Sequence, residues 1–345
     1  MLEGAYFEQA TRIAGWLAGS YPLADGYQRR VLEEAAPSML RSAVSLVEEE
    51  TGLSGVSEPR VAVIDRLRWV ERNLASFSAL LAPVEDKVET GLVEGGIGDS
   101  LSKRIVALEM GILLGLLSHR VLGQYELMIV SPQGGDEVCL PAPNILEFER
   151  RYQFRPAEFR FWVVLHEATH LLQFVGVPWL RSYFLDIASS LVSVSKPDES
   201  RLAVLVSGIQ REGVGGLLSP GEAGIPGLMA TPDELARLDK VQALMSLLEG
   251  HGHVVMDRIA SRHLFTWRRM SALVTKRRNT PRVAAFLRLT GLEMKLRQYE
   301  EGRDFILHVE RRAGWSAVDL AWQSPETLPT RSEIRAPESW LARVG

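Results

Sequence analysis

The feature that most constrains this chain is the run His-Glu-Ala-Thr-His at residues 166–170, which lies inside an apolar stretch. On a helix, positions i and i+4 lie about one turn apart on one face, so His166 and His170 can present two imidazoles to one metal ion. Glu167 lies roughly a third of a turn away, where its carboxylate can reach a metal-bound water without binding the metal. The run therefore predicts two metal ligands and a general base on one helix.

The residues that flank this run favour a helix. Pro156 suits the first turn of a helix, the apolar residues continue to Val175, and Gly176 followed by Pro178 is a stop signal. The alternative interpretation is an ordinary core helix with two histidines that have polar partners. The flanking signals favour the metal-site interpretation.

A catalytic zinc site needs a third protein ligand and leaves its fourth position to water. Metzincins place this ligand six residues after the second His, with a Gly midway between. The chain has Gln173 and Gly176 at those two positions. The metzincin class is therefore excluded, and the third ligand must come from elsewhere.

Glu249 is the best candidate for the third ligand. Its helix is predicted to open with Thr231 as N-cap, Pro232 at the first helical position and Glu234 three residues after the cap, which is a capping box. Glu249 falls inside an apolar stripe at helical spacing, where a carboxylate is costly unless it is paired or bound to metal. The stripe consists of Leu238, Met245, Leu248, Gly252, Met256 and Ile259.

Two glycines in the same helix support this interpretation. Gly250 and Gly252 each cost about 1 kcal/mol relative to Ala inside a helix. Close approach of a second helix would offset this cost, whereas a kink or a helix end is the alternative explanation.

His253 is the rival third ligand, because it follows Glu249 by four residues on the same face. A site of three imidazoles, with Glu249 hydrogen-bonded to one of them, is chemically sound. His251 points to the opposite side of the helix. The other histidines have no partner at ligand spacing and are not expected in the site: His119, His263 and His308.

Several segments carry a resemblance to a known family. They are the motif helix at 166–170, the pair Glu249 and Gly250, the block Gly-Leu-Glu-Met-Lys-Leu-Arg-Gln-Tyr at 291–299 followed by Gly302 and Phe305, and the tail from 328–330 through 340–342. In these segments the chain resembles a family of bacterial zincin-like hydrolases, some of whose members are associated with biosynthesis of the deazaflavin coenzyme. The resemblance implies a zincin-like fold and a hydrolytic role.

Gluzincin-type sites use a Glu as third ligand, followed four residues later by an Asp that supports a metal-bound His. Matched to this pattern, Glu249 takes the ligand position and His253 stands where the Asp would be. An imidazole can hydrogen-bond to a ligand, but it does not supply a fixed negative charge. Asp257 is therefore an alternative support.

Composition limits the classes of partner. The 345 residues are 46% hydrophobic and 24% charged, which suffices for a large core in one large or two smaller domains. A formal charge of −4 and a pI near 6.0 give no electrostatic reason to expect nucleic acid or an anionic membrane. The locally basic stretch 258–303 has its charges at helical spacing with acids nearby, as is typical of a solvated face. The expected partner is a peptide or small amide, and no pattern indicates an oligomeric state.

The sole cysteine, Cys139, has no internal disulfide partner, which is typical of a reducing cytoplasm. The N-terminus lacks the basic start and apolar core of a signal peptide. The longest apolar run, 105–118, is shorter than a membrane span and contains Gly111 and Gly115, which favour a closely packed buried helix. A cytoplasmic location is expected.

Residues 1–122 are predicted to form a helical N-terminal lobe. Apolar periodicity predicts helices over 6–17, 28–51, 59–81 and 101–122. Pro37 predicts a break in the second of them.

Residues 123–345 are predicted to form a zincin-like metal-site lobe, which is compatible with one domain continuous with the first. Strand signals at 125–131 and 136–140 flank a Pro-Gln-Gly-Gly turn and predict a hairpin. Its edge could pair with extended substrate backbone, or the hairpin is purely structural. The segment 211–230 is rich in Gly and Pro and is interpreted as a lid.

These observations predict a predominantly helical α+β protein with a zincin-like metalloprotease-type core and a small β-hairpin. The predicted chemistry is zinc-dependent hydrolysis of a peptide or amide bond. Zn²⁺ held by His166, His170 and Glu249 would lower the pKa of its bound water, and Glu167 would take that water's proton.

An oxyanion donor completes the predicted site. Tyr299, Arg297 and His253 are the candidate donors, and the sequence does not choose among them. Two other classes of function stay open: a metal-stabilised scaffold without catalysis and, on the basic stretch alone, an RNA-associated helical protein.

Overall fold

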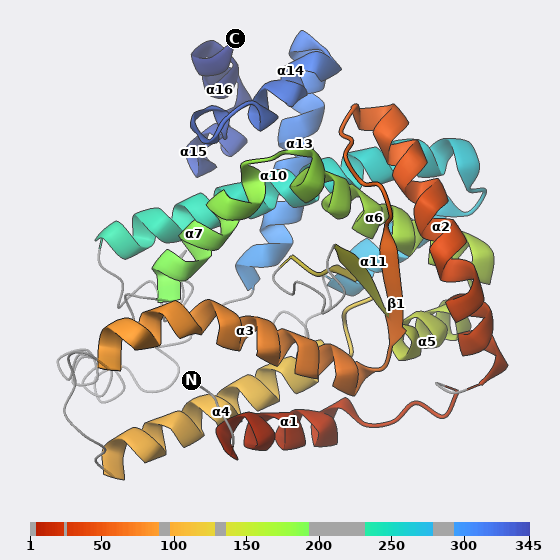
Figure 1. The fold of residues 1–345 in the computed structure, drawn as a ribbon. Coiled ribbons are helices and arrows are strands. Elements are labelled where there is room, and N and C mark those ends of the chain that lie inside the picture. Colours follow the sequence, from red (N-terminus) through yellow and green to blue (C-terminus); the bar gives the residue numbers. More distant parts are fainter. Residues whose placement is uncertain (1–4, 24–25, 90–96, 128–135, 193–231, 279–292) are drawn as a thin grey trace. The chain divides into compact units, whose positions relative to one another are not determined.

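The computed structural model describes residues 5–23, 26–89, 97–127, 136–192, 232–278 and 293–345 (Figure 1). Helices make up most of these residues, and three short strands form one sheet, which confirms a predominantly helical α+β fold. The chain divides into two compact units, Met1–Arg181 with Val255–Met270 and Ser182–Val254 with Ser271–Gly345. A lobe boundary at residue 122 stays a prediction.

The first unit contains the sheet and the helices around it. Its strands are β1 (Arg60–Ile64), β2 (Gln124–Tyr125) and β3 (Glu137–Pro141), in the order β1-β3-β2 with β1 parallel and β2 antiparallel to β3. Its helices are α1 (Ala5–Ala18), α2 (Tyr27–Thr51), α3 (Arg66–Glu89), α4 (Ile97–Leu117), α5 (Ala142–Tyr152) and α6 (Pro156–Gly176).

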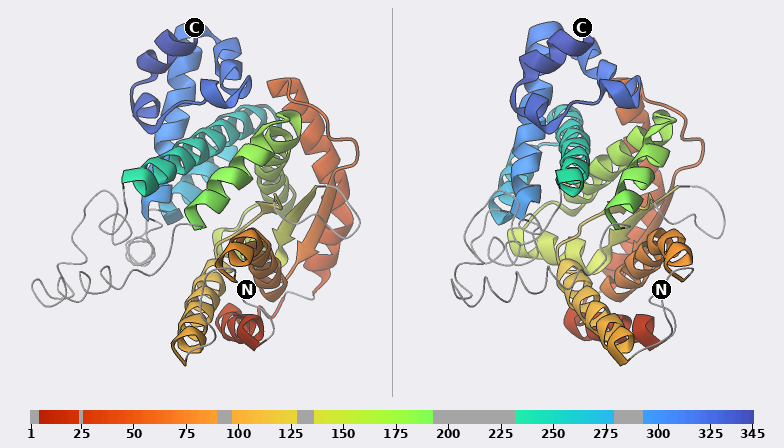
Figure 2. Two further views of the ribbon diagram at one scale, coloured as in Figure 1. Left: turned by 60° about the vertical axis from the view of Figure 1, so that its left-hand side comes forward. Right: turned by 90° about the vertical axis from the view of Figure 1, so that its left-hand side faces the viewer.

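Helices α1 and α4 lie side by side (Figures 1 and 2) and approach closely at two glycines of α4. A Cβ atom on Gly111 would lie 2.7 Å from the carbonyl oxygen of Ala10, and one on Gly115 would lie 2.8 Å from the Cβ of Leu17. The predicted role of both glycines in close packing is confirmed. Among the described residues, no helix is long and apolar enough to cross a membrane.

The helix predicted over 59–81 is wrong in its first part, because residues 60–64 form strand β1. Val61, Val63 and Ile64 are β-branched and favour a strand, and parallel pairing with β3 satisfies the backbone of this segment. Helix α3 begins only at Arg66. Asp65 caps it, since its Oδ1 accepts the backbone N–H of Arg68 at 2.7 Å.

The break predicted near Pro37 is also wrong, because α2 runs unbroken from Tyr27 to Thr51. A proline inside a helix costs about 3 kcal/mol. The face of α2 that contains Leu32, Leu40 and Val47 is fully buried, and each such side chain contributes about 1.5–3 kcal/mol. Burial of this face therefore outweighs the proline.

The predicted pairing of two strands before the motif helix is confirmed, with different bounds. β2 and β3 are antiparallel, and Tyr125 lies opposite Val138. β2 covers two residues rather than 125–131, and residues 128–135 lie outside the described part of the chain. β2 contacts α6, so the sheet lies beside the motif helix.

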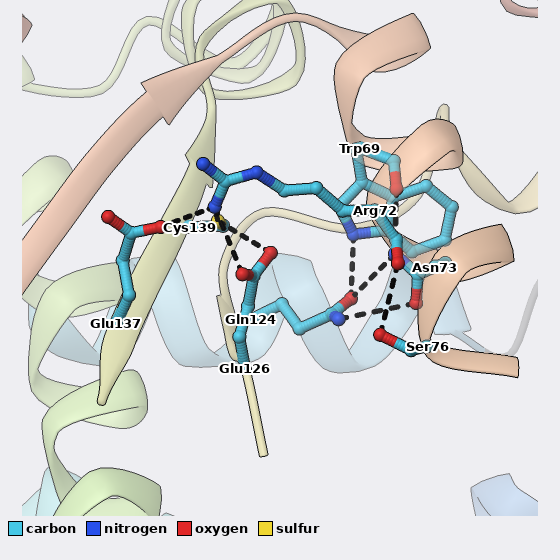
Figure 3. A network of polar contacts seen from close by, with 8 residues as sticks. All are labelled: Trp69, Arg72, Asn73, Ser76, Gln124, Glu126, Glu137 and Cys139. Carbon is cyan, nitrogen blue, oxygen red and sulfur yellow. Dashed lines mark hydrogen bonds and ion pairs between the residues drawn. The ribbon is translucent and has the colours of Figure 1, made fainter. Parts of the chain in front are cut away.

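A polar network fastens the sheet to α3 (Figure 3). Arg72 of α3 donates to the carboxylates of Glu126 and Glu137 and lies 2.8 Å from the sulfur of Cys139. Gln124 of β2 accepts the indole N–H of Trp69 at 2.6 Å. Strands β2 and β3 are thereby both tied to α3.

The remaining helices are α7 (Leu180–Val192), α10 (Pro232–His263), α11 (Trp267–Arg278), α13 (Glu293–Ala313), α14 (Trp315–Asp319), α15 (Arg331–Arg335) and α16 (Pro337–Val344), with short 3-10 turns at Leu320–Trp322 and Pro325–Thr327. In the second unit the tail folds back on α13. Trp340 of α16 is fully buried, its ring lies 5.2 Å from that of Phe305, and its indole N–H donates to the carbonyl of Thr327.

Helices α10 and α13 cross without any side chain between their backbones. A Cβ atom on Gly250 would overlap the carbonyl carbon of Gly302, and one on Gly302 would overlap the carbonyl oxygen of Ser246. Close helix approach, rather than a kink, is therefore the reason for Gly250.

We expect Gly302→Ala to destabilise the protein by about 1–3 kcal/mol, because the two helices must separate to admit the methyl group. The measurement is the midpoint of denaturant unfolding. Gly15→Ala in α1 is the matched control, since its Cβ would meet only the side chain of Leu67, at 3.3 Å, and Ala favours a helix. Equal midpoints for Gly302→Ala and wild type would contradict the tight crossing.

Candidate metal centre

The motif helix forms as predicted, with α6 running from Pro156 to Gly176. It packs against α2 and against β2 and β3. The apolar residues around the motif are buried: Trp162, Val163, Val164, Leu165, Ala168, Leu171 and Leu172. This packing fixes the helix and leaves His166 and His170 partly accessible.

The two histidines converge on one point. The Nε2 atoms of His166 and His170 lie 3.2 Å apart, and the rings stand edge to face at a centroid distance of 4.6 Å. Two nitrogens bound to one tetrahedral zinc at about 2.0–2.1 Å are separated by about 3.3–3.4 Å. The pair therefore fits two ligand positions on a single zinc ion.

Gln173 fixes the orientation of the second histidine. Its Oε1 lies 2.9 Å from Nδ1 of His170, and its side chain is completely buried. With this carbonyl oxygen as acceptor, Gln173 favours the tautomer in which Nδ1 carries the proton and Nε2 keeps its lone pair for a metal. Support of this kind holds a metal-binding imidazole in its working tautomer.

Glu167 lies against the β2 segment. Its side chain is buried, and its Oε2 accepts the backbone N–H of Tyr125 at 3.0 Å. A Cβ atom on Gly123 would come within 2.5 Å of Cγ and 2.7 Å of Oε1 of Glu167. The predicted base is thus enclosed by a strand backbone and does not project freely from the helix.

Glu249 and His253 lie one turn apart on α10, and both are half-buried. This helix begins at Pro232 as predicted, whereas Thr231 lies outside the described residues. The choice between Glu249 and His253 as the third ligand stays a prediction.

Three of the histidines that are not expected in the site contact other parts of the protein. His251 is fully buried beside Trp315 and Trp322, at ring distances of 5.6 and 5.2 Å. His119 bonds to the carbonyl of Leu17 and His308 to Glu338. Their exclusion as ligands stays a prediction.

Two further predictions fall outside what the structure describes. Tyr299 and Arg297 lie on α13, but their side chains are not among the described ones. The Gly- and Pro-rich segment 211–230 lies in the undescribed range 193–231.

Sequence reasoning missed Gln173, Gly123 and Tyr125 as parts of the site. Gln173 had a usable signal, since a polar residue three positions after His170 lies on the same helix face. Gly123 and Tyr125 had none, because they lie more than 40 residues before Glu167 and meet it only through the fold.

A second cluster of potential ligand atoms, from Glu126, Glu137 and Cys139, lies in the sheet. The guanidinium of Arg72 already contacts all three side chains (Figure 3) and supplies the positive charge. Burial raises the pKa of the Cys139 thiol, and the neighbouring Glu126 raises it further. This cluster is a structural ion-pair network.

Comparison with known proteins agrees with the motif. The profile of the zincin-like metallopeptidase family matches residues 6–341. A solved protein from Chloroflexus aurantiacus, described as a candidate hydrolase with a novel fold, is similar over 98% of this chain and 97% of its own, with 28% identity and a TM-score of 0.71. Among curated proteins, none matches. Zincin-like proteins hold a metal ion, typically zinc, and the described residues include candidate ligand groups. The chain belongs to the zincin-like metallopeptidase family.

Proposed function

We propose that this protein is a zinc-dependent hydrolase that acts on a peptide or amide bond. The observation that carries the proposal is the 3.2 Å separation of the His166 and His170 Nε2 atoms, with the other nitrogen of His170 held by Gln173. Membership of a metallopeptidase family supports the hydrolase class. We also propose a cytoplasmic location, which the single free and buried thiol of Cys139 supports.

In this proposal Glu249 is the third ligand. Its carboxylate is half-buried on α10 among apolar residues, where a charge needs a partner, and zinc accepts one carboxylate beside two imidazoles. His253, one turn further along α10, is the alternative ligand or a support for one.

The bound zinc would supply a water that is acidic enough to lose a proton near neutral pH. Glu167 accepts the proton of the attacking water and returns it to the leaving amine. The N–H of Tyr125 holds one oxygen of this carboxylate and thereby fixes its direction. Tyr299 is the proposed donor to the developing oxyanion, with Arg297 and His253 as alternatives.

We expect the purified protein to carry about one zinc ion per chain, because two imidazoles and one carboxylate form a known catalytic zinc set. The measurement is elemental analysis after purification without chelators. His170→Ala should lose the metal, while the matched control His308→Ala, a half-exposed residue bonded to Glu338, should keep it. Absence of any transition metal in the wild type, with no uptake of added zinc, would refute the proposed function.

A further inference from the structure

The edge of β2 that does not pair with β3 faces Glu167, the proposed general base. Along this strand the N–H of Glu126 donates to the carbonyl of Glu137 on β3, at 2.9 Å. Successive N–H groups of a strand point in opposite directions, so the N–H of Tyr125 points away from β3. It donates to Oε2 of Glu167, at 3.0 Å. The strand edge that could have paired with substrate backbone is engaged by the general base.

The absence of a side chain at Gly123 leaves room for the same carboxylate. A Cβ atom there would lie 2.5, 2.7 and 2.8 Å from Cγ, Oε1 and Cδ of Glu167, all closer than real Cβ contacts allow. Glu167 is only 5% exposed and has little room to move aside. A side chain at position 123 must therefore displace the base.

The side chain of Tyr125 anchors the strand in this position. Its ring stacks on Phe174 of α6 at 5.7 Å, and its hydroxyl donates to Asp136 at 2.6 Å. Arg181 contacts both the hydroxyl and Asp136. Burial raises the pKa of Tyr125 to about 12, against the opposing effect of Arg181, so the hydroxyl remains a donor.

We propose that Gly123 and Tyr125 are positioning residues for the general base, so that the β2 edge orients Glu167 rather than binding the backbone of an extended substrate. The inference rests on the proposed function for its catalytic consequence. For the structure, the inference means that a larger residue at position 123 is tolerated only when the side chain at position 167 is shorter. A displacement of about 1 Å in a catalytic group can reduce the rate about 100-fold, so the fit at Gly123 matters for turnover.

The test is a double-mutant cycle with Gly123→Ala and Glu167→Asp in the full-length protein. We expect Gly123→Ala to lower kcat about 100-fold with KM and zinc content unchanged, and to lower the Tm. Glu167→Asp is one methylene shorter and makes room for the new methyl group. In the Gly123→Ala background it should therefore raise both the Tm and kcat, although alone it lowers kcat. Gly15→Ala in α1, where the new methyl group would meet the side chain of Leu67, is the control and should retain wild-type kcat.

Additive effects of the two substitutions on the Tm would overturn the proposal, because a general loss of stability predicts no rescue. This measurement needs no substrate, so it separates failure of the positioning role from failure of the hydrolase proposal, which a wild type that cleaves nothing would indicate. If Gly123→Ala does not fold, the kcat of Tyr125→Phe tests the proposal instead. This substitution keeps the ring on Phe174 and loses the hydroxyl anchor, and an unchanged kcat would overturn the proposal.

Discussion

Glu167→Gln is expected to abolish turnover while leaving zinc content and thermal stability close to those of the wild type. The substitution is nearly isosteric and removes only the proposed base, and loss of a general base typically lowers the rate by about two to four orders of magnitude. The amide oxygen of Gln can still accept the N–H of Tyr125, so the local packing should persist. The measurement is kcat on any substrate found by peptide-library screening, together with elemental zinc analysis.

The matched control is Glu71→Gln, which removes a carboxylate that pairs with the exposed Arg68 on α3. It should behave as the wild type. A Glu167→Gln protein with wild-type activity would remove Glu167 from the mechanism. A zinc-loaded wild type that cleaves nothing in an unbiased screen would favour the alternative function, a metal-stabilised scaffold without catalysis.

Glu249→Ala is expected to weaken zinc affinity by far more than about 100-fold, because it removes the proposed third ligand. His253→Ala should weaken it by only about 10- to 100-fold, the range for a residue that supports a ligand. Competition with a chromophoric chelator measures both dissociation constants under the same conditions. The two residues share one helix and similar burial, so each serves as the control for the other.

The reverse order of the two effects would identify His253 as the ligand. Asp257→Asn adds a third comparison, since Asp257 lies one further turn along α10. A loss of about 10- to 100-fold there would assign to Asp257 the support that gluzincin-type sites take from an acidic residue.

The parts of the fold that were predictable from the sequence are those that depend on neighbours within a few turns. Helix α6 followed from its apolar periodicity and its end signals, and the pairing of His166 with His170 followed from the i, i+4 spacing. Strand β1 was not predictable in this way. Its partner β3 lies 77 residues further on, from Arg60 to Glu137, and no local periodicity reports a parallel pairing at that distance.

In the site, too, the features that depend on near neighbours in the sequence were predictable and those that depend on distant segments were not. The spacing of the residues on α6 determines which of them share a helix face, and Gln173 could have been found from its spacing of three residues after His170. The enclosure of Glu167 could not, because a glycine before a two-residue strand looks like any other loop glycine. Its importance depends on what lies opposite it, which only the folded chain defines.

The buried thiol of Cys139 can report local opening of the sheet in this protein. It is the only cysteine of the chain, it is fully buried in the sheet, and this burial, together with the neighbouring Glu126, raises the pKa of its thiol. A thiol reagent can therefore react only after a local opening that exposes the sulfur. The rate of modification would follow the free energy of that single opening event, so variants of the metal site can be compared for local loosening without labels, engineered cysteines or a known substrate.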